Sequence, residues 1–128
     1  MKLSREASKA EIYNAIGKLK PNNPDSFLIV EIGSDRIDSV QAYMNPDKTY
    51  HVEILRKGGN MTEFNGNRIM VREKVSLADT ITIFKGIAEA GDTSTIYKQY
   101  AGFKDNTTRY LTERKDAHDF RRQHGNNH

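Results

Sequence analysis

The stretch that decides the fold runs from Ile37 to Arg56 and reads IDSVQAYMNPDKTYHVEILR. Hydrophobic and polar side chains alternate on both sides of its centre, as they do in β-strands with one buried face. Residues 45–48 spell NPDK, and proline presets the backbone for the second position of a β-turn. The sequence therefore predicts an antiparallel hairpin made of strands 37–44 and 49–56.

The alternation also assigns each hairpin side chain to a face. One set is expected to face the core: Val40, Ala42, Met44, Tyr50, Val52 and Ile54. From the remaining positions we select exposed candidates for binding a partner: Gln41, Tyr43, His51, Glu53 and Arg56. His51 is the only histidine on the outward side of its strand, so we interpret it as an exposed residue and not as a catalytic one.

Two further segments on either side of the hairpin read as strands. Residues 27–32, FLIVEI, are short, apolar and β-branched, which indicates a central strand with both faces covered. Residues 61–64 and 68–75 flank Asn65-Gly66, a pair typical of a type I′ turn. They predict a second hairpin, whose Ile69 and Val71 are expected to face inward.

Two helices are predicted around these strands. In residues 5–19, apolar side chains recur at helical spacing, and either Ser4 or the Ser8/Glu11 pair can cap the start. In residues 77–90 the same spacing recurs, with Ser76 as the N-cap and Gly91 after the last turn. Because a hairpin sheet cannot bury both faces alone, we expect both helices to cover one face.

The signal weakens after the second helix. Residues 92–103 are compatible with a short helix capped by Asp92 or with an extended edge segment, and residues 107–112 with one more short strand. We therefore expect a single α+β domain over residues 1–111, followed by a charged tail, helical or disordered, over residues 112–128. The predicted sheet is antiparallel, has four to five strands built from two hairpins, and carries the N-terminal and C-terminal helices on one face.

Composition excludes several classes of function. The 128 residues contain no cysteine, which excludes disulfides, thiolate nucleophiles and cysteine-ligated zinc. Residues 1–11, MKLSREASKAE, lack the apolar run of a signal peptide, and no stretch is apolar enough to span a membrane. We expect a cytoplasmic protein without membrane contact. The oligomeric state stays open.

Charge gives little support to nucleic-acid binding. The 20 basic and 17 acidic residues are interspersed, with a net charge of +3, so no block of one sign marks a duplex-binding surface. A single-strand binder needs aromatic side chains within a basic groove. The middle strands carry a basic band, but Glu53, Glu63 and Glu73 interrupt it. Nucleic-acid binding, in a small protein of a phage or mobile element, is therefore our second hypothesis.

Catalytic and metal-binding patterns are weak throughout the sequence. His124 and His128 have a spacing that can ligate a metal on a helix, but the intervening Gly-Asn-Asn favours no helix. No nucleophile elbow and no phosphate-binding glycine loop occurs. The carboxylates are scattered over strands and turns. We expect neither a metal nor a cofactor and no enzymatic activity, and keep a small enzyme with dispersed catalytic residues as a third hypothesis.

The order of the segments resembles a known group of proteins. An N-terminal helix is followed by FLIVEI, IDSVQAYM, the turn NPDK, TYHVEIL, a glycine turn, VSLADTITIFKGIAEAGD and the aromatic YKQY. Over residues 5–100 this layout is similar to that of immunity proteins of bacterial polymorphic toxin systems. The resemblance implies a small non-enzymatic α+β protein that binds and blocks a partner toxin. Our first hypothesis is therefore a protein-binding module of this type.

Overall fold

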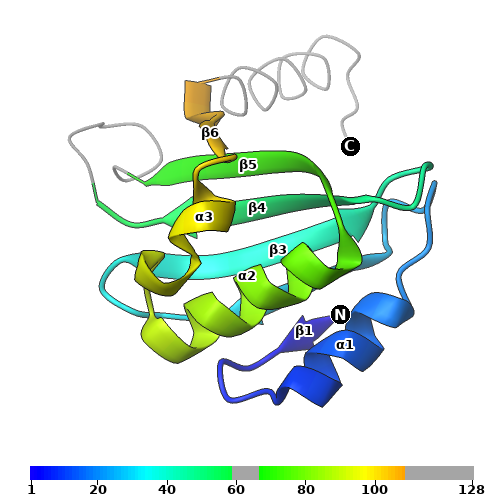
Figure 1. Cartoon of the computed structure of the whole chain (residues 1–128), viewed down its shortest axis with the longest axis horizontal. Coiled ribbons are helices and arrows are strands. Elements are labelled where there is room, and N and C mark those ends of the chain that lie inside the picture. Colours follow the sequence, from blue (N-terminus) through cyan, green and yellow to red (C-terminus); the bar gives the residue numbers. More distant parts are fainter. Residues whose placement is uncertain (59–66, 109–128) are drawn as a thin grey trace, which may run out of the picture.

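The computed structural model describes residues 1–58 and 67–108, which form an α+β fold with a mixed sheet (Figure 1). In chain order, the elements of these residues are β1 (Lys2–Leu3), α1 (Lys9–Gly17), β2 (Phe27–Glu31), β3 (Ile37–Met44), β4 (Tyr50–Arg56), β5 (Arg68–Val75), α2 (Leu77–Ala90), the 3-10 helix η2 (Ser94–Ile96), α3 (Tyr97–Tyr100) and β6 (Lys104–Asp105). The α+β class predicted from the sequence is confirmed.

The strands follow one another across the sheet in the order β1-β2-β3-β4-β5-β6. The predicted hairpin is confirmed: β3 and β4 are antiparallel, and Gln41 lies opposite Glu53 and Tyr43 opposite His51. The prediction of a wholly antiparallel sheet of four to five strands is wrong. The described part has six strands, and β1 pairs in parallel with β2.

Local signals explain where the two longer helices begin and end. The Ser8 hydroxyl accepts from the Glu11 amide, and Glu11 accepts from the Ser8 amide, so Ser8 and not Ser4 caps α1. Ser76 caps α2 through the Asp79 amide. Gly91 ends α2 in the left-handed conformation, with φ of 73°, which glycine adopts without steric cost.

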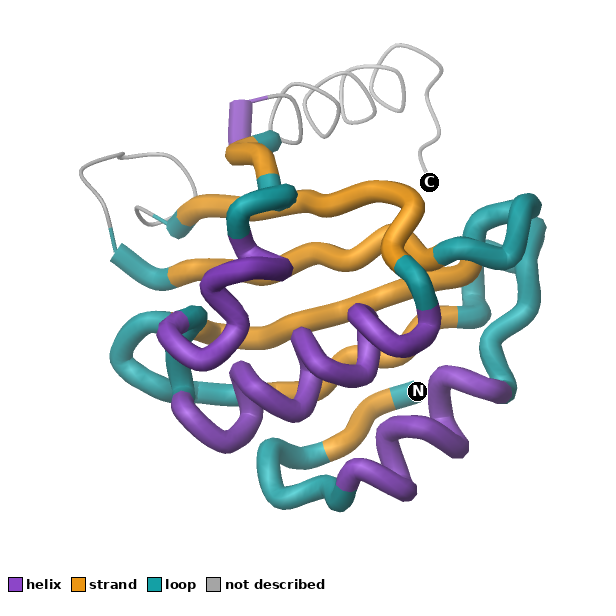
Figure 2. The backbone as a smooth tube through the Cα atoms, in the orientation of Figure 1, coloured by secondary structure: helices purple, strands orange, loops and turns teal. Residues whose placement is uncertain are grey.

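Helices α1 and α2 lie on the same side of the sheet, as Figures 1 and 2 show. Their apolar sides close a core over the buried face of β2, β3 and β4. The side chains that are fully buried there include Ile12, Ile16, Leu28, Val30, Val40, Val52, Ile54, Ile83, Phe84 and Ile87. Alternate residues of the same strands point away from the helices. We call that side of the sheet the outer face.

The predicted orientation of β5 is wrong. Because directly opposed residues share a face, Met70 lies with Ile54 on the helix side, whereas Ile69 and Val71 lie on the outer face. Arg72 is also on the helix side. Its guanidinium contacts the Gln99 carbonyl and the Asp79 carboxylate, both at 3.3 Å, so a charged residue is accommodated there.

Of the two alternatives predicted for residues 92–103, a short helix and an extended edge segment, the structure shows short helices. η2, α3 and β6 follow α2, and the Asp92 carboxylate accepts from the Ser94 amide at the start of this segment. Residues 107–108 are helical and not a strand. The predicted strand 61–64, the Asn65-Gly66 turn, the charged tail 112–128 and its histidines lie outside the described residues. No helix of residues 1–58 and 67–108 has the length and apolarity needed to cross a bilayer.

Candidate functional site

The outer face brings together four of the five candidate residues. Gln41 and Tyr43 stand on β3, and His51 and Glu53 stand opposite them on β4. The fifth, Arg56, is placed wrongly by the sequence analysis. Outward positions on β4 are odd-numbered, so Arg56 falls on the helix side, where its guanidinium donates to the Tyr100 hydroxyl at 2.8 Å.

His51 is the centre of this group and is buried, contrary to the prediction of an exposed residue. Only 7% of its surface is accessible, and the Tyr43 ring stacks on it with centroids 4.4 Å apart. Its Nε2 lies 2.8 Å from Glu53 Oε1. Its Nδ1 lies 2.9 Å from Glu73 Oε2, close enough for an ion pair but without the direction of a proper hydrogen bond. The histidine is thus held between two carboxylates.

Glu73 joins the site because it follows Arg72, the partner of Val52, and so reaches the position opposite His51 on the outer face. The register between β4 and β5 shifts between Tyr50 and Val52, and Lys74 adopts a positive φ of 55°. A bulge of this kind adds a residue to one strand and re-aims its neighbours. Glu73 was not selected from the sequence, since the predicted orientation of β5, with Ile69 and Val71 inward, turns Glu73 inward as well.

The contacts shift the pKa values of His51 and Glu53 in opposite directions. Burial would lower the pKa of His51, but the interactions with Glu53 and Glu73 outweigh it, so the pKa is raised. Burial would raise the pKa of Glu53, but the bonds from His51 and from Gln41, whose Nε2 donates to Glu53 Oε2 at 2.6 Å, lower it overall. Both effects favour an imidazolium between two carboxylates, a group that carries one net negative charge.

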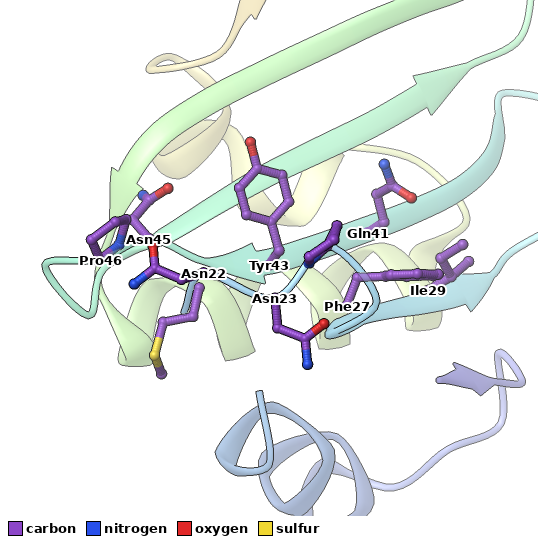
Figure 3. A pocket seen from close by; sticks show the side chains of 10 residues that line it. Asn22, Asn23, Phe27, Ile29, Gln41, Tyr43, Asn45 and Pro46 are labelled. Carbon is purple, nitrogen blue, oxygen red and sulfur yellow. The ribbon is translucent and has the colours of Figure 1, made fainter. Parts of the chain in front are cut away.

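A hollow of about 640 Å³ adjoins this cluster, where β2 begins and β3 ends (Figure 3). Its floor comes from the outer face of the sheet, and its walls come from the loop before β2 and the turn after β3. The described residues that line it carry no charge: Asn22, Asn23, Pro24, Phe27, Ile29, Gln41, Tyr43, Met44, Asn45 and Pro46. Sequence reasoning selected only Gln41 and Tyr43 of these, because the hollow is formed by loops that the strand pattern does not place.

Gln41 and Tyr43 belong to both features. Gln41 lines the hollow and hydrogen-bonds Glu53, and Tyr43 lines the hollow and stacks on His51. The pKa of Tyr43 is raised, first by burial and then by the negative charges of Glu73 and Glu53. The apolar hollow and the acidic cluster therefore form one continuous site. Among the described residues, no group of three or more histidine, aspartate or glutamate side chains is arranged to hold a metal ion.

Comparison with known proteins adds no relative. Neither a protein-family model, nor a curated protein, nor a solved structure matches this chain.

Proposed function

We propose that this protein is a non-enzymatic binding module that engages a protein partner through its outer face. The observation that carries the proposal is the interconnected cluster of Gln41, Tyr43, His51, Glu53 and Glu73 beside an open apolar hollow. Tyr43 is 40% exposed, and the Glu73 side chain is 58% exposed. Anchoring aromatic residues that are held in place by their neighbours, next to charged groups, are typical of protein interfaces.

The histidine geometry favours binding over catalysis. A general acid or base needs an imidazole nitrogen within reach of the substrate. Both nitrogens of His51 face carboxylates of the protein itself, and the ring is covered by Tyr43. In this arrangement His51 serves to hold two negative charges in fixed positions.

The distribution of charge favours a protein partner over nucleic acid. The centre of the outer face carries Glu53 and Glu73, which repel phosphates. The arginines of the middle strands lie elsewhere and are engaged: Arg56 with Tyr100, Arg68 with Asp105, and Arg72 with Asp79. A salt titration with single-stranded and double-stranded nucleic acid tests this alternative, because phosphate binding weakens steeply as salt rises.

The resemblance in element order to immunity proteins names the class of partner to test first, which is a bacterial toxin. In that case the outer face would occupy and block the toxin's active site. The proposal of a toxin as the partner rests on the order of the segments alone.

The proposal is tested by capturing partners from cells of the source organism with tagged protein. Tyr43→Ala removes the exposed ring of the site, and Tyr97→Ala removes an equally prominent ring, 67% exposed, from α3. We expect Tyr43→Ala to reduce recovery of the partner at least tenfold and Tyr97→Ala to leave it unchanged, with both variants folded by circular dichroism. A partner retained equally by both variants would show that the outer face is not the binding surface.

A further inference from the structure

We infer that the outer face recognises a peptide segment in which a large apolar side chain, preferably aromatic, is adjacent to a lysine or arginine. The apolar side chain enters the hollow and the cation lies against Glu73 and Glu53. This inference rests on the proposed function and specifies the chemistry of the partner.

The lining of the hollow selects the first of these two side chains. Phe27, Ile29 and Tyr43 on the sheet, with Pro24 and Pro46 on the two loops, offer apolar contact. Desolvating a charged side chain among them is costly, whereas burying an aromatic one is favourable. The amide groups of Asn22 and Asn23 lie among the lining residues, where they can donate to and accept from a peptide backbone.

The neighbouring cluster selects the second side chain. Gln41 and Tyr43 connect the hollow directly to Glu53 and His51, so the two subsites are separated by a single layer of side chains. Glu53 is largely committed, since its two oxygens face His51 and Gln41. Glu73 is the more exposed carboxylate and stays accessible from solvent. With His51 protonated the cluster retains a net negative charge, which an incoming cation neutralises.

The interaction is tested with defined dipeptides and the full chain, by titration monitored through ¹⁵N-labelled amide resonances. The probes are N-acetyl-Phe-Lys-amide, N-acetyl-Phe-Glu-amide and N-acetyl-Ala-Lys-amide. We expect the Phe-Lys peptide to shift the resonances of residues 27–29 and 41–43 and to bind at least threefold more tightly than either other peptide. Equal binding of all three peptides, or shifts confined to other residues, would overturn the inference.

A pair of glutamate variants isolates the charged subsite. Glu73→Gln removes the exposed carboxylate, and Glu89→Gln removes a similarly exposed carboxylate, 65% accessible, on α2. We expect Glu73→Gln to abolish the preference for Phe-Lys over Phe-Glu, and Glu89→Gln to retain it. A preference that survives Glu73→Gln contradicts the assignment of the cation to the Glu73 side.

The outcomes separate this inference from the proposal on which it rests. If a captured partner depends on Tyr43 but the Phe-Lys peptide shows no preference, the outer face binds a partner of other chemistry and only the inference fails. If the Phe-Lys peptide binds at residues 27–29 and 41–43 while partner capture is insensitive to Tyr43→Ala, the inference about the hollow stands and the proposed function fails.

Discussion

His51 shows how neighbouring carboxylates can favour the charged form of a buried side chain. An isolated imidazolium would lose its charge on burial, because desolvation disfavours the ionised form. Here Glu53 and Glu73 lie 2.8 Å and 2.9 Å from its two ring nitrogens. The protonated form is therefore the one that the fold stabilises, and the stability of the protein becomes linked to pH.

The direction of this linkage can be predicted. The pKa of His51 is raised above 6.5, so its contribution to stability is complete below that value and is lost as the pH rises through the raised pKa. The pKa of Glu53 is lowered from 4.5, so its contribution is present above that value and is lost on acidification through the lowered pKa. We expect the free energy of unfolding in urea to decrease from pH 5.5 to pH 8.5, and the decrease to be smaller in His51→Gln.

The wild type and His51→Gln both contain His118, His124 and His128. The difference between their pH profiles therefore isolates the contribution of His51. Identical slopes in the wild type and in His51→Gln would show that its charge does not contribute to folding.

The placement of single side chains could be predicted from the sequence in part. Alternation along IDSVQAYM and TYHVEIL placed Gln41, Tyr43, His51 and Glu53 on one face correctly. It could not predict that His51 is buried, because Glu73 reaches it from a third strand, and alternation within one strand does not give the pairing between strands. The same alternation, followed strictly along β4, places Arg56 on the helix side with Ile54.

Packing between α2 and the segment after it depends on a glycine within the helix. A Cβ added at Gly86 would lie 2.5 Å from Ile96 Cγ2 and 3.0 Å from Thr95 Oγ1. Ile96 is fully buried, so it has little freedom to move aside. Gly86 thus allows η2 to pack directly on the backbone of α2.

Gly86→Ala is therefore expected to destabilise the protein although alanine is the better helix former. The gain in helix propensity is about 1 kcal/mol, and overpacking of a core contact costs about 1–3 kcal/mol. We expect a net loss of about 1 kcal/mol in urea unfolding. Gly17→Ala, in α1, is the matched control: nothing lies within 4 Å of its added Cβ, so it should be neutral or slightly stabilising. A Gly86→Ala variant as stable as Gly17→Ala would contradict the packing argument.

Elements with their own sequence signals were predicted, and elements without them were not. The cap Ser76 and the stop at Gly91 bounded α2 correctly, whereas the first helix, predicted over residues 5–19, spans only Lys9–Gly17, because Ser8 and not Ser4 is its cap. The orientation of β5 was predicted wrongly, because both of its faces carry apolar residues and the alternation alone does not choose between them. The charged Arg72 is accommodated on the helix side because Asp79 and Gln99 supply its partners.

The sheet as a whole is bordered by two strands of two residues each, β1 and β6. Neither was predicted, because a pair of residues carries no periodicity and its pairing is decided by the folded surroundings. Short, charged edge strands are a common defence against pairing between molecules. β1 is the more important of the two, since it covers β2, whose sequence FLIVE is apolar and prone to pair with further strands.

Removal of residues 1–5 should therefore expose β2 and cause association. The deletion eliminates the Ile29 amide bond to the Met1 carbonyl and the Arg5 bond to the Ala88 carbonyl, at 2.9 Å and 2.7 Å. We expect the free energy of unfolding to fall by about 2–3 kcal/mol, because each of these hydrogen bonds contributes about 1 kcal/mol and the contacts of Leu3 are lost as well. Analytical ultracentrifugation should show more association than the full chain shows at the same concentration.

Arg5→Gln separates the two consequences of that deletion. This variant keeps β1 on the edge of β2 but loses the guanidinium bond to the end of α2. It should lose about 1 kcal/mol of stability and associate no more than the full chain does, because the backbone groups of β2 remain paired. Association of Arg5→Gln to the same degree as the deletion variant would assign the effect to general destabilisation. If only the deletion variant associates, the cause of the association is the uncovered strand β2.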